Sequence, residues 1–193
     1  GLVVSASHNP GGPDGDFGIK YNIANGGPAP EAVTEAIYRR SQEIGRYLTL
    51  AAPDLNIDGI SEQSLSGMVV EVIDPVGDYA VLLQGLFDFD AIAAMLKHAD
   101  FRFRFDAMHA GTGPYAKRLL VDMLGAPRDA VVNAEPLEDF GGGHPDPNPV
   151  YARELYEDAV LHGRLDFAAA SGGAGDRNMF LGAGIAVSPS GTL

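Results

Sequence analysis

The chain has 193 residues, with 26 acidic and 13 basic side chains, so its formal charge is −13 when the histidines are neutral. This excess of acid argues against binding to nucleic acid or to anionic membranes, because Lys and Arg provide most of the attraction to phosphate-rich surfaces. Hydrophobic residues make up 46% of the chain, which predicts a folded protein, and the absence of cysteine excludes disulfides, thiolate metal ligands and a cysteine nucleophile.

The first third of the chain predicts few regular elements. The apolar run Leu2-Val3-Val4, which no initiator Met precedes, is interpreted as the end of a buried strand whose partners lie elsewhere, so we expect a fragment. Residues 11–30 are rich in Gly, Pro, Asn and Asp and predict a loop with one short strand near residues 17–21. Apolar residues then recur at helical spacing from Pro30 towards Tyr47. Residues 48–67 have the composition of an interdomain connection.

From Met68 onward, predicted strands alternate with predicted helices, which indicates a layered α/β structure. The expected strands are residues 68–73, 101–105, 130–133 and 165–170, and the expected helices are residues 75–87, 90–98, 113–125 and 151–162. We expect Gly125 to end the third of these helices. No stretch approaches eighteen consecutive apolar residues, so no membrane span is predicted, and we expect a cytoplasmic location.

Two segments near the N-terminus carry residue types suited to phosphate chemistry. In SASHNPGG, residues 5–12, Ser7 can project into a cleft at the end of a strand, and His8 can exchange protons with an oxyanion. In DFGIKYN, residues 16–22, Lys20 can stabilise negative charge that develops on a reacting phosphate. Taken alone, the first segment is more often an ordinary polar turn and the lysine of the second is more often a solvated surface residue, so the functional interpretation of Lys20 depends on the serine segment.

Two further segments lie after residue 140. In GGGHPDPNP, residues 141–149, His144 and Asp146 can bind a metal or order a loop, and the structural role is favoured because two ligands are too few for a site. In SGGAGDRNM, residues 171–179, Asp176 can bind a hard cation and Arg177 can clamp a phosphoryl oxygen. Taken without context, a glycine-rich turn with an Asp-Arg pair on the surface is the favoured interpretation.

In this order and spacing, the four segments resemble the α-D-phosphohexomutase superfamily, and within it the eukaryotic-type phosphoglucomutases. SASHNPGG resembles the phosphoserine loop of that family and DFGIKYN its DFGIKFN motif, and NGGPAPE, FDFD, DAMH, PLEDFGGGHPDPNP and GDRNMFLG also match in kind. The resemblance implies three-layer α/β/α domains with mixed sheets. Residues 1–67 would be the C-terminal part of an incomplete domain 1 with its linker, residues 68–188 domain 2, and residues 189–193 the start of the connection to domain 3.

The resemblance also implies residue roles. Ser7 would carry a transferable phosphoryl group, His8 and Lys20 would assist proton transfer and charge stabilisation, and Arg177 would contact the phosphoserine. The family interconverts glucose 1-phosphate and glucose 6-phosphate through glucose 1,6-bisphosphate, with Mg²⁺ bridging the phosphoserine and three aspartates. The implied partners are a hexose phosphate and domains 3 and 4 of the same protein, with no nucleic acid and no membrane.

The metal loop departs from the pattern of that family. The family sequence is DGDGDRN, whereas residues 172–178 here read GGAGDRN, so Gly172 and Ala174 stand in place of two aspartates, and Ser7 and Asp176 remain as implied ligands. Mg²⁺ prefers six oxygen ligands, and losing two carboxylates should weaken its binding severely. We therefore expect little or no mutase activity from this chain. A non-catalytic phosphohexomutase-like binding or scaffold protein, and a mutase for another hexose phosphate, are the alternatives.

Overall fold

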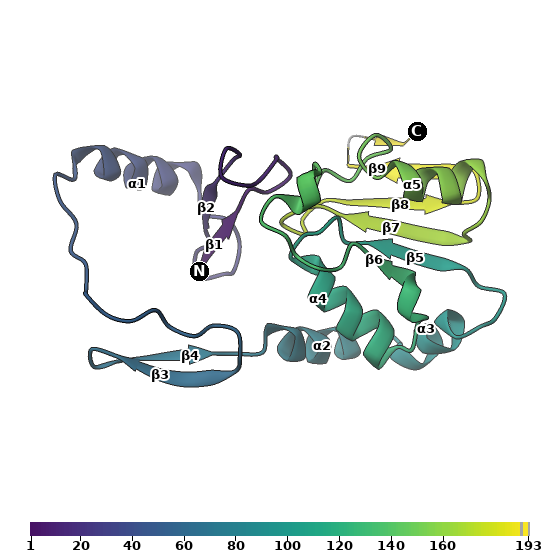
Figure 1. Cartoon of the computed structure of the whole chain (residues 1–193), viewed down its shortest axis with the longest axis horizontal. Helices are drawn as coiled ribbons and strands as arrows, with labels where there is room; N and C mark the ends of the chain where they lie inside the picture. The colour runs from purple at the N-terminus through teal and green to yellow at the C-terminus, as the bar shows by residue number, and fades with distance from the viewer. Residues whose placement is uncertain (190, 193) are drawn as a thin grey trace. The chain divides into compact units, whose positions relative to one another are not determined.

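The chain divides into two compact units in the computed structural model, which describes residues 1–189, 191 and 192 (Figure 1). One unit comprises residues 1–3 and 20–81, and the other comprises residues 4–19 and 82–193. The predicted serine segment thus folds with the C-terminal part of the chain. The family domain boundary after residue 67 stays a prediction, and the predicted connection at 189–193 lies partly outside the described residues.

The N-terminal elements are short and poorly covered. β1 (Leu2–Ser5) and β2 (Gly18–Tyr21) form a two-stranded sheet, which confirms the short strand predicted near residues 17–21. α1 (Glu31–Glu43) begins after Pro30 as predicted, but none of its residues is buried. The Leu2-Val3-Val4 run is exposed in this chain, with Leu2 72% exposed, because a two-stranded sheet offers it no covering layer; its burial against partners that lie elsewhere stays a prediction.

A β-hairpin replaces part of the predicted connection. β3 (Ser61–Leu65) pairs antiparallel with β4 (Met68–Val72), with Ser61 opposite Val72 and Leu65 opposite Met68. The two turn residues have positive φ, 51° at Ser66 and 87° at Gly67, as two-residue hairpin turns require. The polar sequence SEQSL of β3 has no apolar alternation, and for this reason the strand was not predicted.

The two helices that follow begin close to the predicted positions. α2 (Pro75–Leu86) starts at Pro75, and the Asp74 carboxylate accepts hydrogen bonds of 3.1 Å from the first free amides of the helix. α3 (Phe89–Leu96) is capped by Asp88, whose side chain accepts from the amide of Ala91 at 2.9 Å. Within the described residues, no single helix is long and apolar enough to cross a membrane, although α2 and α3 together pass that test with a bend of 101° between them.

The second unit is built on a six-stranded mixed sheet with the order β10-β9-β8-β7-β5-β6. β5 (Phe103–Asp106) lies parallel to its neighbours β6 (Val131–Val132) and β7 (Phe167–Ser171). The sheet continues antiparallel through three strands that were not predicted, β8 (Asn178–Gly182), β9 (Ile185–Ser188) and β10 (Gly191–Thr192). The carboxyl ends of β5, β6 and β7 therefore meet at one edge of the sheet, where ligand sites of α/β proteins usually lie.

Helices cover both faces of this sheet, which confirms the predicted three-layer α/β fold (Figure 1). On one face, α5 (Arg153–Tyr156) and the π-helical segment η4 (Glu157–Leu161) pack on β7, β8 and β9 through Leu155 and Ala159. On the other, α3, α4 (Thr112–Ala116) and the π-helical η1 (Lys117–Met123) pack around Phe103 and Phe105. Gly125, with φ 77°, ends the α4–η1 helix as predicted. Two 3₁₀ turns, η2 (Arg128–Ala130) and η3 (Phe140–Gly142), complete the unit.

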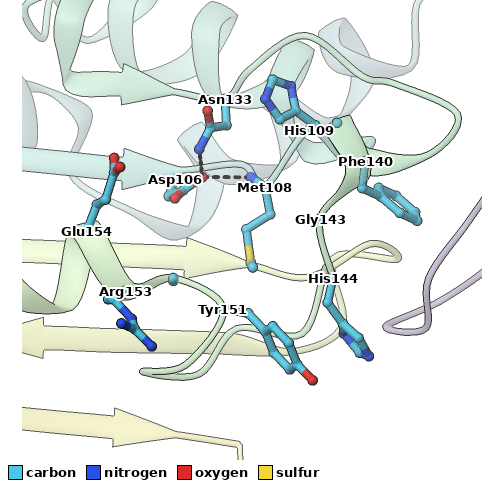
Figure 2. A pocket seen from close by; sticks show the side chains of 12 residues that line it. Asp106, Met108, His109, Asn133, Phe140, Gly143, His144, Tyr151, Arg153 and Glu154 are labelled. Atoms are coloured by element: carbon cyan, nitrogen blue, oxygen red, sulfur yellow. Dashed lines mark hydrogen bonds between the residues drawn. The ribbon is translucent and has the colours of Figure 1, made fainter.

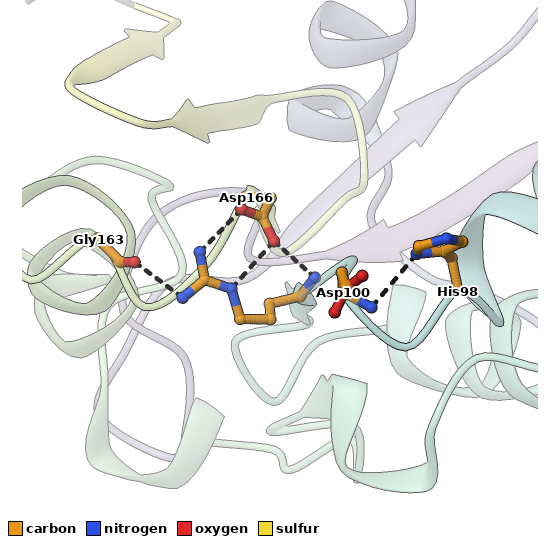
Figure 3. Close-up of polar contacts among 5 residues, drawn as sticks. His98, Asp100, Gly163 and Asp166 are labelled. Carbon is orange, nitrogen blue, oxygen red and sulfur yellow. Dashed lines mark hydrogen bonds and ion pairs between the residues drawn. The ribbon is translucent and has the colours of Figure 1, made fainter.

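Ion pairs hold the amino end of β5 to neighbouring elements. Arg102 donates from its guanidinium to both carboxylate oxygens of Asp166 at 2.8 and 3.0 Å, and to the carbonyl of Gly163 at 3.0 Å (Figure 3). These side-chain bonds, with a further one from the Arg102 amide, lower the pKa of Asp166 to about 2. Burial alone would raise the pKa of Asp158, but hydrogen bonds from Arg164 and Arg104 outweigh it, and the pKa lies below its ordinary value.

Candidate active site

The serine loop, residues Ser5–Gly12, turns sharply at the end of β1. The amide of Ser7 donates to the hydroxyl of Ser5 at 2.8 Å, and the amide of Asn9 donates to the carbonyl of Ala6 at 3.2 Å. Ser7 has a φ of 64°, a left-handed conformation that costs a serine free energy and often marks functional sites. Nδ1 of the neighbouring His8 lies 3.4 Å from Ser7 Oγ, and both side chains are half-buried.

The glycine-rich loop, residues Gly172–Arg177, joins β7 to β8 by a tight turn. The amide of Gly172 donates to the carbonyl of Arg177 at 2.9 Å, and the amide of Gly175 donates to the carbonyl of Gly172 at 3.0 Å. Gly175 has a φ of 74°, which the turn requires and which other residues rarely adopt. Asp176 is exposed and Arg177 is half-buried. The backbone of this loop is thus closed by its own hydrogen bonds.

The serine loop and the glycine-rich loop touch each other within the second unit. A Cβ placed on Gly173 would lie 1.8 Å from the carbonyl oxygen of Ser7, which is far inside any allowed contact. Glycine is therefore the residue that allows this approach. The fold brings Ser7 next to the loop that carries Asp176 and Arg177, although these residues are far apart in the sequence. Their chemical roles stay predictions.

Lys20, the other predicted cation, lies on β2 and belongs to the first unit, whereas Ser7, His8, Asp176 and Arg177 belong to the second. Its predicted action on a phosphate held by Ser7 therefore stays a prediction.

The residues of the glycine-rich loop do not fit a Mg²⁺ site. Ser7 and Asp176 supply two of the implied ligands, and across residues 1–189, 191 and 192 no three His, Cys, Asp or Glu side chains gather as metal ligands would. A Cβ on Gly172 would lie 2.8 Å from the carbonyl oxygen of Pro145 and 3.1 Å from Cδ of Pro147. An aspartate at position 172 would thus have to displace a backbone group. The donor set is too small for Mg²⁺, and the space for one missing ligand is closed.

The proline-rich segment, residues 143–149, supports the glycine-rich loop. Pro145 and Pro147 are fully buried, and the carbonyl of Pro145 accepts a hydrogen bond from the amide of Gly173 at 3.1 Å. The ring of His144 stacks on Tyr151 with a centroid distance of 4.1 Å. Asp146 accepts a hydrogen bond from the Asn148 side chain at 2.8 Å. These contacts agree with the structural role favoured for this segment, which orders the loop beside Ser7.

A pocket of about 460 Å³ lies at the carboxyl ends of β5 and β6 (Figure 2). The buried carboxylate of Asp106 accepts hydrogen bonds from the amide of Met108 at 2.8 Å and from the side chain of Asn133 at 3.0 Å. Four lining residues other than glycine have positive φ: Met108, His109, Asn133 and Phe140. Nδ1 of His109 donates to the carbonyl of Glu135 at 2.9 Å. The DAMH and PLEDF motifs match the family pattern in sequence, but the sequence did not predict that residues of both motifs line one pocket in left-handed conformations.

Comparisons with known proteins agree with the resemblance stated from the motifs. A family model described as phosphoglucomutase/phosphomannomutase, alpha/beta/alpha domain I, matches residues 1–48. The chain is 54% identical over 193 residues to a phosphoglucomutase of Rhizobium radiobacter, covering 100% of this chain and 35% of that protein. It is 52% identical over 192 residues to the chloroplastic phosphoglucomutase 1 of Marchantia polymorpha, covering 98% of this chain and 29% of that protein.

A solved structure gives the same result. The open form of the exocytosis-sensitive phosphoprotein pp63/parafusin, a phosphoglucomutase from Paramecium, superimposes with a TM-score of 0.90 at 44% identity and covers 98% of this chain and 36% of that protein. The chain thus spans about a third of the length of the relatives it matches.

Proposed function

We propose that this chain, which belongs to the phosphoglucomutase/phosphomannomutase family, is part of an enzyme that moves a phosphoryl group between two positions of a hexose phosphate. The expected substrates are glucose 1-phosphate and glucose 6-phosphate, since the most similar relatives reported above are named phosphoglucomutases. Residues that select the sugar are not assigned to this chain. A cytoplasmic location, and the absence of nucleic acid and membrane partners, stay predictions.

One observation carries the proposal: Ser7, in a strained left-handed conformation, lies in direct contact with the loop that bears Arg177. A hydroxyl on a rigid turn is suited to carry a phosphoryl group, because its position is fixed before the reaction. A neighbouring guanidinium can donate two parallel hydrogen bonds to phosphoryl oxygens. The half-buried setting of both residues strengthens such charge-assisted bonds.

The proposed reaction has two balanced steps. A hydroxyl of the hexose monophosphate attacks the phosphorus of phosphorylated Ser7, the bond from Ser7 Oγ to phosphorus breaks, and the attacking hydroxyl loses its proton. The product is a hexose bisphosphate, which the family resemblance implies to be glucose 1,6-bisphosphate. In the second step, Ser7 Oγ attacks the phosphorus of the other phosphoryl group, the bond from that phosphorus to the sugar oxygen breaks, and the sugar oxygen takes a proton as the isomeric monophosphate leaves. His8 is the proposed proton carrier, and Arg177 and Lys20 are the proposed cations that neutralise the phosphoryl oxygens.

The test uses the full-length protein. Intact-mass and peptide mass spectrometry should find phosphate on Ser7, and turnover of glucose 1-phosphate should need catalytic amounts of glucose 1,6-bisphosphate. The Ser7→Ala variant should lose both the phosphate and at least about 10³-fold of any turnover, because the carrier group is removed. Ser41→Ala is the control, since its hydroxyl lies on the exposed helix α1, where it donates to the carbonyl of Tyr38. Full turnover in Ser7→Ala would refute the assignment.

A second candidate is a phosphohexomutase-like protein that binds a ligand or partner without turnover. The closed space at Gly172 and the absence of a carboxylate at Ala174 favour it. The family resemblance implies Mg²⁺ as cofactor, and this loop lacks its donor set. Calorimetric titration of the full-length protein with Mg²⁺ separates the two candidates. Binding in the micromolar range supports the enzyme, whereas no detectable heat together with unphosphorylated Ser7 supports the binding protein.

A further inference from the structure

The ring of Phe140 lies at both loops of the candidate site. A Cβ placed on Gly11 of the serine loop would lie 2.6 Å from the carbonyl oxygen of Glu138 and 2.9 Å from Cε2 of Phe140. A Cβ placed on Gly173 of the glycine-rich loop would lie 3.4 Å from Cζ of the same ring. Adjacent carbons at the tip of one side chain therefore border both loops. All three residues belong to the second unit.

The backbone that carries Phe140 is anchored to the sheet. The amide of Leu137 donates to the carbonyl of His109 at 3.0 Å, just beyond the end of β5, and the amide of Phe140 donates to the carbonyl of Leu137 at 3.0 Å. Asp139 closes the next turn by accepting from the amide of Gly141 at 3.0 Å. The ring is thus supported from the sheet, independently of the two loops that it borders.

The conformation of Phe140 is unfavourable for a bulky residue. Its φ is 53°, and Gly141 and Gly142 continue with φ values of 68° and 73°. A left-handed phenylalanine costs about 1–2 kcal/mol, so the surrounding packing must hold it there. A smaller residue or glycine would suit the backbone better. The strain therefore points to a role for the ring itself.

We propose that Phe140 is a positioning residue that fixes the serine loop against the glycine-rich loop. Its ring acts as a spacer between Gly11 and Gly173, so the phosphate-carrying hydroxyl and the Arg177 loop keep one mutual position. The segment next to it contributes a second contact, because a Cβ on Gly12 would lie 3.3 Å from Cβ of Asp139. The effect on turnover rests on the proposed function, whereas the effect on loop mobility does not.

Hydrogen exchange measured by mass spectrometry on the full-length protein tests the proposal. Phe140→Leu keeps an apolar residue and the same backbone strain, but it cannot reach both glycines. We expect faster exchange in two separate segments, residues 5–12 and 171–177, which are joined through this ring. The informative amides are those of Asn9, which donates to the carbonyl of Ala6 within the serine loop, and of Gly173, which donates to the carbonyl of Pro145 beside the glycine-rich loop. Phe140→Tyr places a hydroxyl on Cζ, the ring atom that borders Gly173, so it should disturb the glycine-rich loop even though the ring is kept.

Two variants control this experiment. Phe180→Leu removes a ring that is 47% exposed on β8 and that stacks on Phe167 at 6.3 Å, so it should change neither loop. Gly11→Ala adds a methyl group that would meet the carbonyl oxygen of Glu138 at 2.6 Å and Cε2 of Phe140 at 2.9 Å, so it should loosen the serine loop even with Phe140 in place. Faster exchange confined to residues 137–143 in Phe140→Leu would show a merely local structural role and would overturn the proposal.

Turnover gives an independent measure if the parent protein is active. Phe140→Leu should lower kcat about ten- to a hundredfold and change KM less than about twofold, because misplacing a reacting group by an ångström affects the chemical step more than binding. An equal rise in KM with unchanged kcat would contradict positioning. If the parent protein shows no turnover, the proposed function fails, and the exchange experiment still decides the role of Phe140.

Discussion

The serine loop and the glycine-rich loop meet at one contact, yet they differ in what they retain. The serine loop has both the shape and the reactive groups, Ser7 and His8, that phosphoryl transfer needs. The glycine-rich loop has glycines at positions 172 and 173, where the backbone of a neighbour approaches, but it carries Gly172 and Ala174 where the resemblance implies metal ligands. Packing at this site therefore depends on small residues and buried prolines.

The largest effect is expected from Gly173→Ala. Its methyl group would lie 1.8 Å from the carbonyl of Ser7, and a backbone carbonyl cannot rotate away as a side chain can. We expect a loss of about 1–3 kcal/mol in unfolding free energy, measured by denaturant titration of the full-length protein, with faster amide exchange in the serine loop. Gly111→Ala is the control, because nothing lies within 4 Å of its Cβ. Equal stability of the two variants would refute the contact between the loops.

Gly172→Asp and Ala174→Asp separate packing from ligand chemistry. At position 172 a side chain meets the carbonyl of Pro145 at 2.8 Å, so we expect a loss of about 1–3 kcal/mol in unfolding free energy. Position 174 already has a Cβ, so we expect a change within about 0.5 kcal/mol for Ala174→Asp.

The two substitutions also test the metal prediction. Ala174→Asp should bind Mg²⁺ more tightly than the parent protein in calorimetric titration, and the double variant should bind it more tightly still only if the carbonyl of Pro145 moves away from the new side chain at position 172. Ala174→Asn is the matched control, since it adds a similar volume without the charge. No gain in Mg²⁺ affinity in Ala174→Asp would mean that residue 174 does not correspond to a family ligand.

Elements with strong local signals could be predicted from the sequence. Pro75 begins α2, and the alternation of Phe and Arg marks β5. Gly125 ends the α4–η1 helix. β3 was missed because its sequence is polar, and the Ser66-Gly67 turn before β4 was the available signal. β8 and β9 were missed although a turn with Gly184 separates two apolar runs.

The site could be predicted in part. The motifs placed Ser7, His8, Asp176 and Arg177 as candidates, and the contact at Gly173 joins the loops that carry them. Phe140 could not be found in this way, because its conformation and contacts depend on two loops that are distant in the sequence. Local patterns encode turns and strands, whereas a ring that separates two loops is determined by tertiary packing.

The smallest change in stability is expected from a substitution at the amino end of β5, where the carboxylate of Asp166 accepts hydrogen bonds from Arg102. The bonds from Arg102 hold the pKa of Asp166 at about 2 in the folded state, below its ordinary value of 3.8, so the pair stabilises the fold at neutral pH and loses this contribution as the pH falls from about 4 to about 2. Asp166→Asn should therefore unfold at a slightly lower temperature than the parent protein at pH 7, and the difference should shrink towards pH 2. The pair is solvent-exposed, which keeps the change in unfolding temperature small.

Amide exchange in the serine and glycine-rich loops should not change in Asp166→Asn, since glycine packing holds these loops. Faster exchange in both loops would show that the two ends of the sheet are coupled.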